Sequence, residues 1–195
     1  MEEFEVKNFN VLGVKVFGLK DFFDSRGSFT EIFSKKFLDH NELNFFNIAQ
    51  VNLSVSKKNT FRGIHFSNSK KLQHKLVMCL EGSISDFVVD TRVGSPTFGQ
   101  VDRFELDSNR RKLIFIPAGC GHGFFAKMNK TKILYAQSSE YSPDEEFDLS
   151  CLDKLLNLNL GDIRKLILSE KDKSAKNLEE HRRNGVLPKY SSTHE

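Results

Sequence analysis

Short apolar or alternating runs, separated by turn sequences, recur along most of this chain. Turn sequences such as Asp24–Gly27, Glu81–Gly82 and Pro117–Gly119 fall between the runs. Many short strands at such close spacing are typical of a β-sandwich or barrel. The sequence therefore predicts an all-β fold, with strands expected within Val11–Leu19, Phe29–Phe33, Phe46–Val55, His74–Leu80, Ser83–Val89, Thr97–Leu106, Lys112–Ile116, His122–Ala126 and Lys132–Ser138.

Helical signals are few and short. Lys35–Glu42 predicts a short helix, and a helical turn is expected near Asp153–Leu156. Lys171–Glu195 is highly charged and predicts a surface helix or a loose tail, with residues 176–195 as a possible C-terminal tail. Neither an internal repeat nor a low-complexity linker is visible, so residues 1–195 are expected to form a single domain.

Charge and cysteine content exclude several classes of protein. The 29 basic and 26 acidic residues give a net charge of 29 − 26 = +3, too small for a strongly basic nucleic-acid binder. No apolar run reaches the length of a membrane span, and the acidic N-terminus lacks the apolar core of a secretory signal. The three cysteines have no CxxC spacing, which disfavours disulfides and thiolate zinc sites. We expect a cytoplasmic protein with neither a membrane nor a nucleic-acid partner.

One predicted strand carries an unusual pair of acidic residues. Period-two alternation places Asp86 and Asp90 on the same face as Ile84 and Val88. Such a face either forms a polar patch inside a barrel mouth or is simply solvated, and the pattern leaves both interpretations open.

Two segments hold most of the residues capable of chemistry. The first is Phe61–Ser67, followed by Gln73–Val77, and the second is Ile116–Phe124, which contains a PxGxxH element. Together they resemble the paired signature of the cupin superfamily. That resemblance implies a cupin jelly-roll barrel with a few short peripheral helices.

The same residues argue against a metal site. Metal-binding cupins supply two histidines and a carboxylate from the first segment, but Ser67 stands two residues after His65, and Lys75 adds an ammonium. We therefore expect no metal and no other cofactor. A histidine in such a barrel is better suited to act as a general base.

Further motifs make the resemblance specific. Over residues 11–175 the chain resembles the dTDP-4-dehydrorhamnose 3,5-epimerase family, cofactor-free cupins that act on nucleotide-linked 4-keto-6-deoxy sugars. Besides the segments above, the matching motifs are Asp24–Glu31, Gln50–Ser54, Val89–Arg92, Ser95–Gly99, Tyr135, Tyr141–Pro143 and Leu168–Asp172.

The resemblance implies epimerisation at C3 and C5 of a nucleotide-linked 4-keto-6-deoxyhexose for deoxysugar biosynthesis. Inversion beside a ketone needs a base, an acid on the opposite face and a donor near the developing enolate oxygen. By resemblance, His65 is the base with Asp172 as its carboxylate partner. Tyr135 matches the proton donor, and Lys75 matches the cation near the sugar oxygens.

The resemblance also implies how the nucleotide-diphosphate sugar is bound. Arg26 and Arg62 match positions that face the pyrophosphate, and Tyr141 matches a ring that stacks on the base. A homodimer is implied, with N-terminal strands that pair across the interface and carry Arg26 to the neighbouring site. Other positions that match ligand contacts are Glu31, Gln50, Asn52, His122, Glu146 and Lys171.

Taken without the resemblance, several of these residues have simpler explanations. Arg26 fits a solvated turn, Tyr135 a core position, and Asp172 a solvated run of charges. The chain also lacks Trp, and Asp148–Leu160 matches the family poorly. Four alternatives therefore remain: a single-carbon epimerase, a 3,4-ketoisomerase, a non-catalytic nucleotide-sugar-binding cupin, and a metal-dependent cupin oxygenase.

Overall fold

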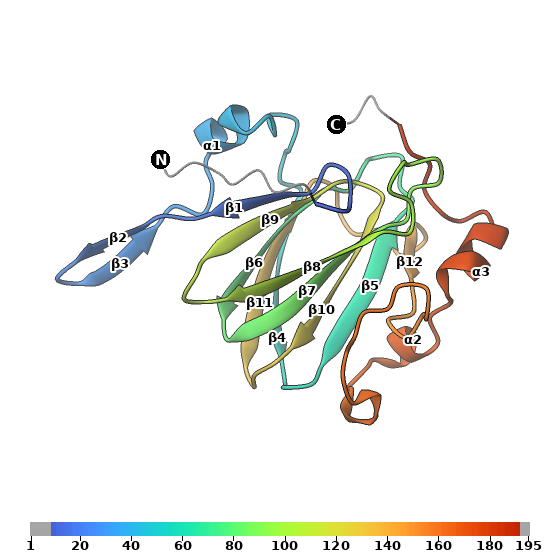
Figure 1. The fold of residues 1–195 in the computed structure, drawn as a ribbon. Helices are drawn as coiled ribbons and strands as arrows, with labels where there is room; N and C mark the ends of the chain where they lie inside the picture. The colour runs from blue at the N-terminus through green and yellow to red at the C-terminus, as the bar shows by residue number, and fades with distance from the viewer. Residues whose placement is uncertain (1–8, 192–195) are drawn as a thin grey trace.

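A computed structural model describes residues 9–191, and two five-stranded antiparallel sheets form its body (Figure 1). One sheet contains, in spatial order, β1 (Lys15–Gly18), β9 (Lys112–Ile116), β6 (Lys75–Glu81), β11 (Thr131–Gln137) and β4 (Gln50–Ser56). The other contains β12 (Glu146–Asp148), β5 (Phe61–Ser67), β10 (Cys120–Ala126), β7 (Ser83–Asp90) and β8 (Val101–Asp107). The prediction of an all-β cupin barrel is confirmed.

The barrel interior is built from alternate residues of these strands. In β6 the inward positions include Val77 and Cys79, and in β11 they include Ile133, all essentially inaccessible to solvent. Successive side chains of a strand point to opposite faces, so the inward series continues to Lys75 in β6 and to Tyr135 in β11. The apolar core thus gives way to polar side chains at one end of the barrel.

Most alternating runs form the strands they predict, but three short or irregular strands were missed. Strand β2 (Asp21–Asp24) pairs only with β3 (Gly27–Thr30), and β12 has three residues. Strand β5 is interrupted by Gly63, so its sequence does not alternate. Strands β5 and β12 pair with each other, but the sequence pattern of neither strand reveals this pairing.

The helical predictions have mixed outcomes. Helix α1 (Lys35–His40) confirms the expected short helix, and the Ser34 hydroxyl caps it by accepting from the amide of Phe37. A single hydrogen-bonded turn forms at Asp153–Leu156, where the sequence predicts one helical turn. A 3₁₀ turn, η1, spans Ile163–Lys165. Among the described residues, no helix is both long and apolar enough to cross a membrane.

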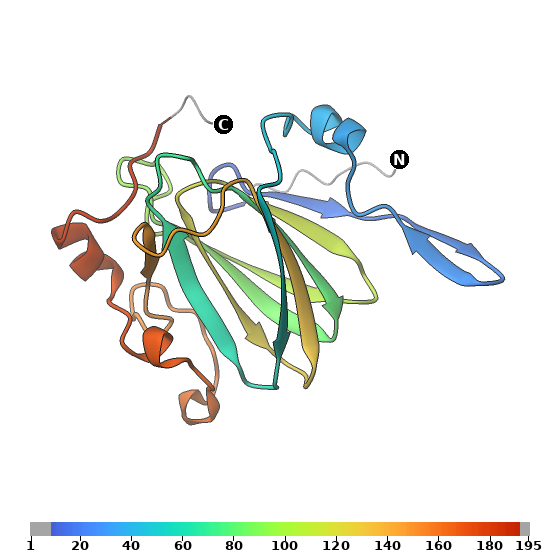
Figure 2. The same ribbon diagram turned by 180° about the vertical axis from the view of Figure 1, so that it is seen from behind.

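The charged C-terminal segment packs against the barrel along residues 170–190 (Figure 2). It contains α2 (Glu170–Lys173) and α3 (Leu178–Arg183). Leu178 and Leu187 are buried in one cluster with Phe61 and Phe66 of β5. Burying two leucines contributes about 3–6 kcal/mol, so a loose tail is wrong for this stretch. Residues 192–195 of the expected tail lie outside the described residues.

Asp86 and Asp90 are completely buried in β7, so the solvated-face interpretation is wrong. Asp86 pairs with His122, whereas Asp90 accepts hydrogen bonds from Arg92, Ser95 and Thr97. The inward face of β7 is therefore polar at two positions, and both have dedicated partners.

The β2–β3 hairpin projects away from the barrel in both views (Figures 1 and 2). Its phenylalanines Phe22, Phe23 and Phe29 are 53%, 77% and 68% exposed. Edge strand β4 likewise presents Val51, Leu53 and Val55 to solvent. These surfaces are more apolar than a monomer needs.

Candidate active site

Close contact between β5 and β10 sets the position of the first candidate residue. Gly63 has φ +105°, and a Cβ there would lie 2.5 Å from the carbonyl oxygen of His122. Only glycine fits this backbone and this contact. Two residues later, His65 stands opposite His122 in the β5–β10 ladder, at the polar end of the barrel.

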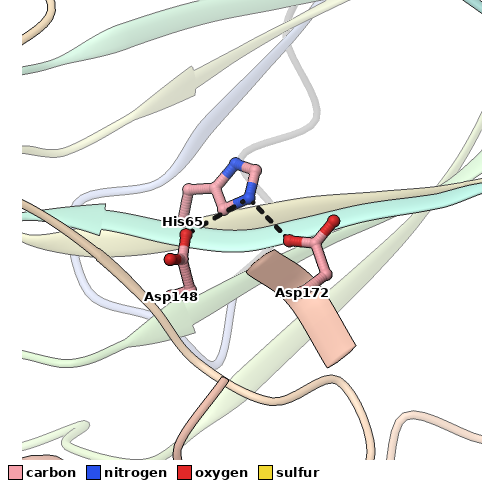
Figure 3. A group of neighbouring side chains, drawn as sticks. All are labelled: His65, Asp148 and Asp172. Carbon is pink, nitrogen blue, oxygen red and sulfur yellow. Dashed lines mark hydrogen bonds and ion pairs between the residues drawn. The ribbon is translucent and has the colours of Figure 1, made fainter. Parts of the chain in front are cut away.

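The His65 imidazole is bonded to the Asp172 carboxylate of α2 (Figure 3). Its Nε2 lies 2.9 Å from Asp172 Oδ1, and the Ser169 hydroxyl donates to Asp172 Oδ2 at 2.7 Å. Burial alone would raise the pKa of Asp172, but the hydrogen bonds from His65 and Ser169 hold that pKa below its usual value. The carboxylate therefore stays ionised at neutral pH.

This bond determines which ring nitrogen of His65 is basic. An ionised carboxylate accepts hydrogen bonds, so Nε2 carries the proton of the neutral imidazole. The lone pair is then on Nδ1. The arrangement orients an imidazole whose Nδ1 can accept a proton and whose cation is stabilised by Asp172.

Lys75 and Tyr135 lie on the facing sheet. Lys75 is buried, its Nζ is 3.5 Å from the carbonyl oxygen of His65, and burial lowers its pKa. Tyr135 is partly buried, and burial raises the pKa of its phenol. The positive charge of Arg62 lowers this pKa, and the negative charge of Glu146 raises it. A phenol with a raised pKa remains protonated at neutral pH and can donate.

A chain of side-chain amides lines the wall formed by β4 and β11. Gln50 donates to Asn52 at 2.8 Å, and Asn52 donates to Gln137 at 3.0 Å. Gln50 Oε1 accepts from the backbone amide of Tyr141 at 2.9 Å. The ring of Tyr141 is half exposed. Gln50, Asn52 and Tyr141 therefore belong to one connected network.

Three further predicted residues complete the polar surroundings. Glu146 of β12 accepts from Gln73 at 2.7 Å, and Arg62 of β5 donates to Ser56 Oγ at 3.0 Å. The charges of both affect the pKa of Tyr135, which Arg62 lowers and Glu146 raises. Lys171 of α2 forms an ion pair with Asp148 of β12, with Nζ 3.0 Å from Oδ1.

His122 is buried and is bonded to a buried carboxylate. Its Nε2 lies 2.8 Å and 3.1 Å from the two carboxylate oxygens of Asp86. This bond to a buried carboxylate fixes the orientation of the His122 ring.

Arg26 and Glu31 are not brought to this cluster. Arg26 lies in the β2–β3 turn, where its exposed guanidinium pairs with Asp24 at 2.6 Å. Glu31 directly follows the hairpin and accepts from Ser34 at 2.9 Å. Because the β2–β3 hairpin projects from the barrel, both residues lie outside the cluster around His65.

Sequence reasoning missed Asp148, whose carboxylate is 3.5 Å from His65 Nε2. The available signal was that Asp148 stands two residues after Glu146 in a strand, so the two side chains share a face. His65, Asp148 and Asp172 place three possible metal-ligand atoms within 4.8 Å of one another. Because the Lys171 ammonium already pairs with Asp148, this set suits an ion-pair network better than a cation.

Comparisons with known proteins show the family of the chain. The family model described as dTDP-4-dehydrorhamnose 3,5-epimerase matches residues 8–180. A dTDP-4-dehydrorhamnose 3,5-epimerase of Mycolicibacterium smegmatis is 38% identical over 168 residues, 86% of this chain and 83% of the relative. A dTDP-4-dehydro-6-deoxyglucose 3-epimerase of Streptomyces bikiniensis is 35% identical over 150 residues, 77% of this chain and 76% of the relative.

Solved structures give the same result. An epimerase of Mycobacterium tuberculosis superimposes with a TM-score of 0.87 at 35% identity, covering 94% of this chain and 93% of that one. The 3,5-epimerase of Legionella pneumophila, solved in complex with dTDP-4-keto-L-rhamnose, gives a TM-score of 0.83 at 34% identity, covering 92% of this chain and 94% of that one.

Proposed function

This chain belongs to the dTDP-4-dehydrorhamnose 3,5-epimerase family, and on that basis we propose that it inverts C3 and C5 of a dTDP-linked 4-keto-6-deoxyhexose. It is an isomerase of nucleotide sugars. The observation that carries the residue-level proposal is the 2.9 Å bond between His65 and Asp172, in a barrel mouth that also contains Lys75 and Tyr135.

In the proposed mechanism, His65 removes the proton from a carbon next to the ketone. The electron pair of the broken C–H bond moves into an enolate, whose negative charge rests on the former carbonyl oxygen. Asp172 stabilises the imidazolium that forms, and the buried charge of Lys75 stabilises the enolate. Buried charges act strongly here because little water screens them.

Tyr135 then returns a proton to the opposite face of the carbon. It belongs to the sheet facing His65, and its raised pKa keeps the phenol protonated at neutral pH. The tyrosinate that forms takes a proton from solvent, and the His65 imidazolium releases its proton to solvent, which restores both groups. Repeating the cycle at the second carbon inverts both centres.

The remaining polar residues are proposed to bind the nucleotide sugar. The Arg62 guanidinium suits a pyrophosphate, and the half-exposed ring of Tyr141 can stack on a base. Gln50, Asn52, Glu146, Lys171 and His122 supply donors and acceptors around the sugar. No metal or other cofactor takes part in the proposed chemistry.

A single-carbon epimerase is the second candidate, because a 3-epimerase is among the relatives. The proposal is tested by turnover of dTDP-4-keto-6-deoxyglucose in D₂O, with the product analysed by mass spectrometry and NMR. Two deuterons with inversion at C3 and C5 support the proposal, and one deuteron supports a single-carbon epimerase. A 3-keto product would indicate a ketoisomerase. Nucleotide-sugar binding without exchange would indicate a non-catalytic protein.

We also propose that the enzyme is a homodimer in which the β2–β3 hairpin reaches the neighbouring subunit. The exposed phenylalanines of the hairpin and the apolar face of β4 support this proposal, because both would be covered in a dimer. Arg26, at the hairpin turn, would then serve the partner's active site and bind the pyrophosphate there.

A cytoplasmic location is proposed as well. Cys79 and Cys151 are buried free thiols. Burial raises the pKa of Cys79 and of Cys151 to about 11, which makes both unreactive at neutral pH. Free thiols of this kind fit a reducing compartment.

A further inference from the structure

A second carboxylate contacts the same nitrogen of His65 as Asp172 does (Figure 3). Asp148 Oδ1 lies 3.5 Å from Nε2, compared with 2.9 Å for Asp172 Oδ1. The Asp148 side chain is only 13% exposed, so water screens its charge weakly. His65 is therefore influenced by two nearby negative charges.

Backbone contacts hold Asp148 in this position. It pairs with His65 in the β12–β5 ladder, and the next residue, Leu149, exchanges two backbone hydrogen bonds with Ile64. The carbonyl oxygen of Asp148 accepts from His181 Nε2 of α3 at 2.9 Å. The proximity of the two side chains thus follows from strand pairing and from the docked helix.

Two carboxylates beside one imidazole would make a poor general base. Each favours the imidazolium, which has no lone pair to accept a proton. Lys171 offsets this effect, because its Nζ lies 3.0 Å from Asp148 Oδ1. Burial would lower the pKa of Lys171, but Asp148 more than compensates and the pKa is raised, so the ammonium persists through neutral pH.

We propose that the Asp148–Lys171 ion pair sets the proton affinity of His65, with Asp148 as a positioning residue that acts through the imidazole. Asp148 raises the proton affinity of the base, and Lys171 limits that rise. The inference deepens the proposed function and rests on His65 being its base.

Other charged or titratable groups surround His65 and stay unchanged in the test below. They are Asp172 of α2, Glu146 of β12, Lys75 of β6, Tyr135 of β11, Arg62 of β5, the His122–Asp86 pair of β10 and β7, His181 of α3, and the thiol of Cys151. Asp148 and Lys171 can be removed separately, and the two removals should have effects of opposite sign.

The experiment compares pH profiles of kcat/KM for the wild type, Asp148→Asn, Lys171→Met and the double variant. The acid limb should move to lower pH in Asp148→Asn and to higher pH in Lys171→Met, each by about one pH unit. In the double variant it should return close to the wild-type position. Shifts in the same direction, or no shift, would overturn the inference.

Lys173→Met is the matched control. Lys173 is in the same helix and pairs with Glu170 at 2.6 Å, and its charge contacts neither Asp148 nor His65 in any described interaction. Its profile should coincide with that of the wild type. An equal shift in this control would show that helix charge in general, rather than the Asp148 ion pair, is responsible.

An NMR titration of the His65 ring in the free protein separates this inference from the proposed function. The same order of midpoints is expected without substrate. Ordered midpoints in a protein with no epimerase activity would refute the function and keep the inference. Midpoints that are the same in all variants of an active enzyme would refute the inference and keep the proposed function. If Asp148→Asn does not fold, the direction of the Lys171→Met shift decides.

Discussion

His65 of β5 and Asp172 of α2 are 107 residues apart in the chain, yet His65 Nε2 and Asp172 Oδ1 are 2.9 Å apart. The C-terminal segment delivers the carboxylate by packing Leu178 and Leu187 against the outer face of the sheet that contains β5. The segment beyond the barrel strands therefore contributes directly to the candidate active site.

Replacing Asp172 by Asn should lower kcat by about 10²–10⁴-fold, because the imidazole loses the partner that selects its tautomer and stabilises its cation. KM should change little, since Asp172 is bonded to His65 and Ser169 and not placed to bind the sugar. Steady-state kinetics measures both. Asp162→Asn is the control, because this carboxylate pairs with Arg164 away from the barrel mouth. Equal kcat in both variants would remove Asp172 from the mechanism.

Tyr135→Phe should separate proton removal from proton return. The His65–Asp172 pair is intact in this variant, so the substrate should still exchange hydrogen with D₂O. Inversion should fall by about 10²-fold or more, because the donor on the opposite face is missing. NMR of the recovered substrate and the product follows both events. Inversion at the wild-type rate would show that another group supplies the proton.

Arg26 should act on the neighbouring subunit if the proposed dimer is correct. Arg26→Ala and His65→Asn should each be nearly inactive as homodimers. In a mixed dimer, one site combines the intact His65 of one chain with the intact Arg26 of the other. Up to about half of the activity per mixed dimer should then return, as the arithmetic of two sites requires. Absence of any recovery in dimers proven to be mixed would place Arg26 outside the partner's site.

Asp90 provides a prediction about stability. It is fully buried and accepts from Arg92 at 2.9 Å, from Ser95 at 2.5 Å and from Thr97 at 2.6 Å. Asp90→Asn should lower the free energy of unfolding by about 3–5 kcal/mol at pH 7, because the buried guanidinium of Arg92 loses its carboxylate partner. Urea unfolding measures this loss.

The same residue predicts a pH dependence. Burial would raise the pKa of Asp90, but hydrogen bonds from Arg92, Ser95 and Thr97 hold the pKa below its usual value. The folded state therefore binds its proton less readily than the unfolded state, whose carboxyl titrates near pH 4. This stabilisation is present above about pH 4 and is lost as the pH falls through the lower folded pKa. The unfolding free energy of Asp90→Asn should fall less steeply there, whereas parallel curves would contradict the assignment.

The barrel could be predicted from the sequence because most of its strands depend on local patterns, whereas the role of His65 came from the family resemblance. Short apolar runs identify β6 and β9, whose two faces are both buried, and apolar or alternating runs identify β7 and β11. The segments that contain His65 and His122 are recognised by their resemblance to the paired cupin signature.

The long-range contacts could not be derived in the same way. Asp172 stands in a run of charges that looks solvated, and only the family resemblance connected it with His65. Asp148 belongs to a three-residue strand whose partner is β5, and a pairing of this kind leaves no pattern in either sequence. Leu178 and Leu187 are too sparse in a charged segment to predict docking.

The role of His65 as the base can be tested directly by deuterium exchange at C3 and C5 of the substrate in D₂O. His65→Asn keeps a polar side chain of similar reach but lacks a basic nitrogen. Exchange at both carbons should occur with the wild type and should be abolished in the variant, with the substrate still bound. Exchange in His65→Asn at the wild-type rate would contradict the assignment of His65 as the base.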